Sequence, residues 1–162
     1  MASHFDTSLE LRSKRGSKPV FYKHDGTRFS NSVTIKLCVG QTYTMYVYFR
    51  PSLVLEKWLI QSERVNFSQV QLPRKWVKED ASVFSADWST EHFKVSKKGQ
   101  REEIALHFEL ERGLILNTSI QVKFYTGDNH ATWGQPMHAL ELSCDSPAQG
   151  QTNVNVRRGS IV

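Results

Sequence analysis

The side chains best suited to chemistry in this sequence are its six histidines, at positions 4, 24, 92, 107, 130 and 138. No two of them stand at a spacing typical of metal ligands. His24 precedes Asp25, and His130 ends the run Asp128–Asn129–His130, so a carboxylate and an imidazole could meet if these two turns converge. Exposed turn residues are the alternative, because these residue types are common in turns. The sequence predicts no metal ion and no cofactor.

Motifs of common catalytic sites are missing from the sequence as well. A serine hydrolase elbow would read G-x-S-x-G, a phosphate loop G-x-x-x-x-G-K-[ST] and a zinc protease helix H-E-x-x-H. None of these occurs, and Asp80, Asp87 and Glu91 show no spacing that acid–base chemistry would single out. We therefore expect a protein that is not an enzyme and has no catalytic residues.

An alternation of apolar and polar residues with a period of two runs through the chain. In residues 104–110, IALHFEL, the isoleucine, the leucines and the phenylalanine share one face, which is typical of a half-buried strand. Similar runs predict strands near residues 5–11, 20–23, 33–39, 43–50, 54–60, 83–89, 120–125 and 137–144. Only residues 50–65 could also hold a short helix. The sequence predicts an all-β fold, an antiparallel β-barrel or β-sandwich of about nine or ten strands.

Length and composition indicate one soluble domain. A chain of 162 residues can bury a core without disulfides or metal, and we expect one β domain over residues 1–145. The polar tail, residues 146–162, is expected either to be mobile or to be pinned along the domain. Cys38 and Cys144 are expected to be small core or surface residues rather than a disulfide. No apolar run approaches the ~18 residues of a membrane span, so we expect a cytoplasmic protein without direct membrane insertion.

The chain is basic, with a formal net charge of +5. Its lysines and arginines are scattered in small clusters, and no helix-turn-helix, zinc-finger or RNA-binding signature is present. We therefore expect no nucleic acid partner. An acidic peptide or an anionic membrane surface suits this charge better.

The stretch PVFYKHDGTRF, residues 19–29, is dense in aromatic and charged side chains. Asp25-Gly26 is a favoured pair for a two-residue hairpin turn, because glycine adopts positive φ without a steric cost. The stretch is therefore predicted to be a hairpin that joins two strands. A ligand-binding loop is the alternative, and partner contact is allowed as a second role.

Aromatic residues provide the binding candidates. In YTMYVYF, residues 43–49, Tyr46 and Tyr48 lie opposite Met45 and Val47, so they are either an exposed patch or core residues of a sheet covered on both sides. Trp133 lies between a loop and a Gly-Pro pair, where it either caps the end of the fold or presents an edge to a partner. The predicted binding residues, chosen because we expect them to be exposed, are Tyr46, Tyr48, Lys123 and Trp133.

Several segments together resemble the cannabinoid-receptor-interacting protein family. They are PVFYKHDGTRF, TIKL at 34–37, KKGQRE at 97–102, QVKFY at 121–125 and WG-P at 133–136. The resemblance is strongest at residues 19–39 and 120–136 and weak at residues 53–92 and after Asp145. The strand YTMYVYF is more aromatic than the family pattern.

The resemblance implies a compact β-barrel or sandwich, similar in shape to the Rho GDP-dissociation inhibitors. It also implies a non-enzymatic intracellular protein that binds the cytoplasmic C-terminal tail of the type-1 cannabinoid receptor and modulates its signalling. Localisation at the plasma membrane, or in a cilium, would then come through a partner.

Three functions compete at this stage. An adaptor would bind a peptide or protein segment through a sheet edge or a basic rim. A carrier of a lipid or lipidated tail would need a deep apolar pocket, which large side chains such as Phe108, Phe124 and Trp88 would fill if they point inward. A structural subunit of a larger cytoskeletal or ciliary assembly would be held by its aromatic face and its tail.

Overall fold

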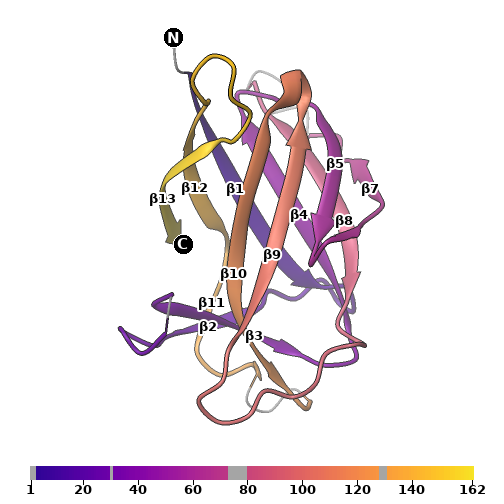
Figure 1. Cartoon of the computed structure of the whole chain (residues 1–162). Helices are drawn as coiled ribbons and strands as arrows, with labels where there is room; N and C mark the ends of the chain where they lie inside the picture. The colour runs from indigo at the N-terminus through magenta and orange to yellow at the C-terminus, as the bar shows by residue number, and fades with distance from the viewer. Residues whose placement is uncertain (1–2, 30, 73–79, 128–130) are drawn as a thin grey trace.

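The computed structural model describes residues 3–29, 31–72, 80–127 and 131–162, which form two β-sheets packed face to face (Figure 1). The six-stranded sheet has the spatial order β13 (Asn155–Ile161), β12 (Leu140–Asp145), β1 (His4–Ser13), β4 (Thr42–Arg50), β8 (Ser82–Ser89) and β7 (Phe67–Gln69). The seven-stranded sheet has the order β11 (Gln135–Pro136), β2 (Phe21–His24), β3 (Val33–Cys38), β10 (Ile115–Tyr125), β9 (Glu102–Leu110), β5 (Leu55–Ile60) and β6 (Glu63–Arg64).

The all-β prediction is confirmed, and of its two alternatives the sandwich is the one that forms. Every segment predicted as a strand overlaps one, including residues 54–60, where a helix was the alternative. Each sheet ends in two edge strands instead of closing on itself. The strands that the pattern missed are β6, β7 and β11, of two or three residues each, and β13. A stretch of two or three residues is too short to show a period.

One strand pair departs from the predicted antiparallel arrangement. β3 and β10 run parallel, with Ile35 opposite Val122 and Lys36 opposite Lys123. Parallel neighbours cannot be joined by a tight turn, so they must come from segments far apart in the chain. Here the connection between them includes β4, β5, β8 and β9, which puts the start of the chain beside its second half.

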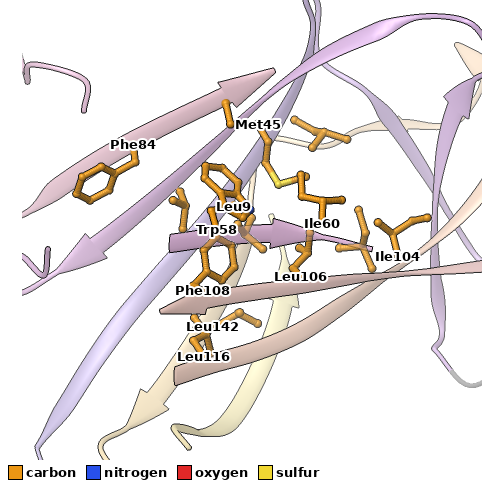
Figure 2. Packing of buried hydrophobic residues seen from close by; sticks show 14 of the residues in the cluster. Leu9, Met45, Trp58, Ile60, Phe84, Ile104, Leu106, Phe108, Leu116 and Leu142 are labelled. Carbon is orange, nitrogen blue, oxygen red and sulfur yellow. The ribbon is translucent and has the colours of Figure 1, made fainter. Parts of the chain in front are cut away.

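The core lies between the two sheets and is filled by the inward residues of the alternating strands. Phe108 and Trp58 have no exposed surface, and their ring centroids lie 5.1 Å apart (Figure 2). Met45 and Leu106 pack near them from opposite sheets. A void lined by residues of both sheets, including Leu9, measures about 10 Å³. Such a space barely admits one water molecule.

The hairpin prediction for residues 19–29 is confirmed, but its two-residue turn is wrong. β2 pairs antiparallel with β3, and the last pair is His24 with Val33. Residues 25–32 therefore join the strands, closed by a 2.7 Å hydrogen bond from the Asp25 amide to the Ser32 carbonyl. Gly26 has a φ of +63°, whereas Asp25 does not have the positive φ that a type I′ turn requires. The Asp25 carboxylate is held elsewhere, as described below.

The C-terminal segment lies along the six-stranded sheet. β13 pairs antiparallel with β12, with a register shift at Ser143 and Cys144, and the Val154 amide donates a 2.8 Å hydrogen bond to the Ile115 carbonyl. Cys144 and Cys38 are both buried, so of the predicted core and surface positions both occupy the core. Among the described residues, no helix is long and apolar enough to cross a membrane.

Replacing Phe108 by alanine should lower the free energy of unfolding by about 3–5 kcal/mol, because a fully buried ring is lost and the two sheets close the cavity only in part. Val54→Ala is the matched control, since Val54 is 56% exposed and should change stability little. Urea unfolding of both variants measures the difference. Equal losses would contradict the packing described here.

Candidate functional site

A buried ion pair stands at the centre of the candidate site. The Arg101 guanidinium donates two hydrogen bonds to the Asp25 carboxylate, from Nε to Oδ2 at 3.1 Å and from Nη2 to Oδ1 at 3.2 Å. Only 5% of the Asp25 side chain and 6% of the Arg101 side chain are exposed. Asp25 follows β2 and Arg101 precedes β9, so the pair ties two connections that lie far apart in the chain. Such a two-point contact fixes orientation as well as distance.

Polar groups around the pair complete its hydrogen bonding. The Thr34 hydroxyl donates to Asp25 Oδ2 and accepts a 3.1 Å bond from Arg101 Nε. Gln121 Nε2 donates to the Thr34 hydroxyl and to the Asn31 carbonyl, both at 2.9 Å. Burial would raise the pKa of Asp25, but the hydrogen bonds from Arg101 and Thr34 outweigh burial and hold this pKa below its ordinary value. Asp25 is therefore a carboxylate at neutral pH.

Phe29 covers the ion pair from the loop that follows β2. The guanidinium carbon of Arg101 lies 4.2 Å from the centre of the Phe29 ring, and that of Arg28 lies 5.2 Å from it. An arginine stacked on an aromatic face gains a cation–π attraction while its edge stays free for hydrogen bonds. Residues 19–29 thus contact Arg101 twice, through the Asp25 carboxylate and through the Phe29 ring.

Three lysines surround the ion pair on the outward side of the seven-stranded sheet. Lys36 and Lys123 lie opposite one another on β3 and β10, and Lys23 Nζ lies 3.9 Å from Asp25 Oδ1. Burial lowers the pKa of all three, and neighbouring cations lower it further. For Lys123 these cations are first Lys23 and then Arg101. One carboxylate thus stands among several cations.

The segment around Trp133 docks on the same part of the sheet. The Lys36 ammonium donates a hydrogen bond to the Trp133 carbonyl, and the Tyr22 hydroxyl donates a 2.7 Å bond to Gln135 Oε1. Gly134 has a φ of +122°, and a Cβ there would lie 2.6 Å from the Tyr22 carbonyl oxygen, so only glycine fits this close approach. Trp133 itself is 60% exposed. It therefore presents its ring to solvent rather than capping the fold.

The predicted binding residues divide between two faces. Lys123 and Trp133 come together through Lys36. With Lys23 and the Asp25–Arg101 pair they form what we call the basic site. Tyr46 and Tyr48 lie on β4, on the outward face of the other sheet, and both are half-buried. The Tyr48 hydroxyl donates a 3.2 Å bond to Glu10, and burial followed by the charge of Glu10 raises the pKa of Tyr48 to about 12.

A polar hollow of about 490 Å³ lies beside Tyr48. Its lining includes Glu10, Arg50, Glu141 and Arg158. Acidic and basic side chains are mixed there, and a carboxylate already accepts the hydrogen bond of the tyrosine. This hollow is less selective for charge than the basic site on the opposite sheet.

The basic site is built from segments that are widely separated in the sequence. Asp25, Thr34, Arg101, Gln121 and Trp133 each come from a different one of the segments on which the family resemblance was based. A family model described as CB1 cannabinoid receptor-interacting protein 1 matches residues 1–160. The chain belongs to this family.

Relatives with this name cover most of the chain. The human CB1 cannabinoid receptor-interacting protein 1 is 32% identical over 143 residues, which are 85% of this chain and 84% of the relative. The proteins of the same name from Bos taurus and Mus musculus are 31% and 29% identical over the same lengths. The predicted membership of the cannabinoid-receptor-interacting protein family is therefore confirmed.

Sequence reasoning named two members of the basic site in this family member and missed the ion pair at its centre. Arg101 was seen only as one residue of a segment that resembles the family, and Asp25 only as a turn residue or as half of a carboxylate–imidazole site. The missed signal was that the quoted family segments include Asp25, Thr34, Arg101 and Gln121, whose side chains can all form hydrogen bonds or ion pairs with one another. The suggested meeting of His24-Asp25 with residues 128–130 lies partly outside the described residues.

The chemistry that this arrangement can perform is recognition of a negatively charged group. Lys23 and Lys123 offer ammonium groups that are partly dehydrated, so an anion meets them with a smaller solvation barrier. In the part of the chain that the structure describes, no group of three or more metal-ligating side chains is found.

Asp25→Ala should destabilise the protein by about 3–5 kcal/mol, because Arg101 would stay buried without its carboxylate. The matched control is Asp87→Ala: its ion pair with Lys14 is exposed and should contribute about 1 kcal/mol or less. Urea unfolding at neutral pH measures both. Similar losses of unfolding free energy in the two variants would show that the buried pair stabilises the protein no more than an exposed pair does.

The same variant has a characteristic pH dependence. Since the folded pKa of Asp25 is lowered, its stabilising effect is present above the ordinary carboxyl pKa and is lost as the pH falls through the lowered value. The stability gap between wild type and Asp25→Ala should therefore shrink in acid. A gap that does not change with pH would contradict the ionised pair.

Proposed function

We propose that this protein is a non-enzymatic interaction protein that binds an acidic segment of a partner at the basic site around Asp25 and Arg101. By family, the partner is the cytoplasmic C-terminal tail of a cannabinoid-type receptor, whose signalling the bound protein modulates. The protein is then cytoplasmic and reaches the plasma membrane through that partner. The observation that carries the proposal is the convergence of the family segments on one cluster of half-buried cations.

Charge supports an acidic partner. Lys23, Lys36 and Lys123 stand close enough to lower one another's pKa, so a carboxylate brought among them relieves repulsion that the free protein carries. Asp25 relieves this repulsion only in part: its charge raises the pKa of each lysine, but burial and the neighbouring cations outweigh it. An acidic segment of a partner would supply the missing negative charge.

Trp133 supports a peptide rather than a simple anion. Its ring is exposed, and its carbonyl is held by Lys36 of the site. Tryptophan beside cationic groups is a frequent energetic centre of protein interfaces, because it buries a large apolar area at a small entropic cost. A partner segment with an apolar residue next to its carboxylates would use both features.

The alternatives gain less from the structure. A lipid carrier needs a deep apolar pocket, whereas Phe108, Phe124 and Trp88 point into the space between the sheets and fill it. A structural subunit of a larger assembly would expose a broad apolar face. In the described residues the exposed large apolar side chains are divided among four segments: Val54, Val95 and Trp133 each lie on one, and Val156 and Val162 share the C-terminal one.

The test is titration of the protein with a synthetic peptide of the receptor C-terminal tail, followed by calorimetry. We expect saturable binding that weakens with salt and falls about tenfold for each of Lys23→Gln and Lys123→Gln, as expected for lost charge-assisted contacts. The matched control is Lys18→Gln, which removes the same single charge from an exposed position elsewhere. A peptide with amides in place of its carboxylates should bind weakly.

Two results would overturn the proposal. One is equal loss of binding in the site variants and in the control, which would mean that only net charge matters. The other is no binding to the wild type, together with recovery of the protein from native lysate only within a stable multi-protein complex. That second result would favour the structural subunit.

Binding should also weaken in mild alkali. The pKa values of Lys23, Lys36 and Lys123 lie below their ordinary 10.5 in the free protein, and a bound carboxylate raises them again. Binding therefore takes up protons and loses affinity as the pH rises through the lowered values. Calorimetry between about pH 7 and pH 10 should show this loss before the ordinary lysine range. A flat profile would place the peptide elsewhere.

A further inference from the structure

β13 is an open edge on the six-stranded sheet. Of the four edge strands among the described residues, β6 and β11 have two residues each and β7 has three, and β11 also contains Pro136. Short strands and proline are the usual means of blocking unwanted pairing. β13 has seven residues without proline, and residues 155–160 are all exposed. In Figure 1 it forms the outer margin of its sheet, with β12 on one side only.

The hydrogen bonds to the neighbouring strand fix which backbone groups of β13 point outward. The amides of Ala139 and Val162 donate to each other's carbonyls, so these residues form a hydrogen-bonded pair. Along antiparallel strands such pairs alternate with pairs whose N–H and C=O groups point away. Ser160 and Arg158 therefore bond to β12, whereas Gly159 and Ile161 turn their amides and carbonyls away from the sheet.

The side chains of β13 add a charge preference. Arg158 lies opposite Ser143 and lines the polar hollow on the outward face of the sheet. Arg157, in contrast, is engaged by its own sheet: its Nη1 lies 3.4 Å from both oxygens of Asp145. Among the described residues Arg158 has no ion-pair partner. On the inner face Gly159 leaves the backbone uncovered, and Ile161 is half-buried against the core.

We propose that β13 binds an extended acidic segment of a partner protein as an additional antiparallel strand. The incoming backbone bonds to the outward amides and carbonyls of Gly159 and Ile161. Its residue opposite Arg158 is a carboxylate on the outward face, and its residues opposite Gly159 and Ile161 are apolar and extend the core. This surface is separate from the basic site, which lies on the other sheet, so the inference does not depend on the proposed function.

Charge argues against a second copy of the chain as the occupant. Two β13 strands paired edge to edge would bring Arg157 and Arg158 of each copy close to the same residues of the other. Like charges on neighbouring strands destabilise the pairing. A segment with alternating apolar and acidic residues meets the same edge without this repulsion.

The probe is an acetylated peptide as long as β13 in which valine and glutamate alternate. In antiparallel register its valines bond to Gly159 and Ile161 and its glutamates face Arg158. We expect the amide hydrogen exchange of Gly159 and Ile161, fast in the free protein, to slow about tenfold or more with saturating peptide. The exchange of Ser160, whose amide already bonds to β12, should not change.

Modified peptides separate strand addition from simple attraction of charge. N-methylation of the valines removes the bonds to β13 and should abolish binding, whereas N-methylation of the glutamates should leave it intact. A peptide with lysine in place of glutamate should bind weakly. Arg158→Glu should reverse this charge preference, and Arg64→Glu, an exposed arginine on the edge strand β6 of the other sheet, is the matched control.

Each result decides the proposal. Slowed exchange of Gly159 and Ile161 that depends on the valine amides supports it. Binding that survives methylation of the valines, or no binding by the wild type, overturns it. Slowed exchange that grows with protein concentration in the absence of peptide also overturns it, because the occupant of the edge would then be a second copy.

Discussion

The buried ion pair between Asp25 and Arg101 is the interaction on which the basic face of the molecule depends. Burying two charges costs solvation that their attraction repays only when the geometry is good and the other hydrogen bonds are satisfied. Here two parallel hydrogen bonds, the Thr34 hydroxyl and the Phe29 ring meet those conditions. The pair fixes the long loop after β2 and lets several cations share one small area.

The same strands serve the core and the binding face at once. On β10, Val122 and Phe124 point inward and are fully buried, whereas Lys123 and Tyr125 point outward. Since the side chains of a strand alternate, the apolar packing that stabilises the sandwich also sets the spacing of the cations on its surface. Burial first, and the neighbouring cations second, lower the pKa values of these lysines. A bound anion would counteract this lowering.

Local patterns in the sequence predicted the strands, whereas the pairing of strands and the partners of buried charges depend on long-range contacts. Residues 104–110 alternate so regularly that both the strand and its buried face followed from the sequence. For residues 43–49 the strand and the opposite faces of Met45 and Tyr46 followed, but not whether the tyrosine face is exposed. The parallel pairing of β3 with β10 and the pairing of Asp25 with Arg101 join residues that are far apart in the chain, 76 residues in the second case. The alternation of apolar and polar residues contains no information on such contacts. The Asp25-Gly26 motif also gave a wrong prediction, because Asp25 binds Arg101 and does not form a two-residue turn.

The two surfaces differ in what a partner would have to order. In the basic site the cations are fixed by a buried pair, and on the edge β13 is fixed by β12, by the Arg157–Asp145 pair and by Ile161 against the core. In both cases the protein is ordered before the partner arrives, so the entropic cost of binding falls mainly on the partner segment. A flexible acidic segment suits such rigid surfaces. A strand added to β13 would gain main-chain hydrogen bonds without sequence preference, and Arg158 would then select among extended segments by charge.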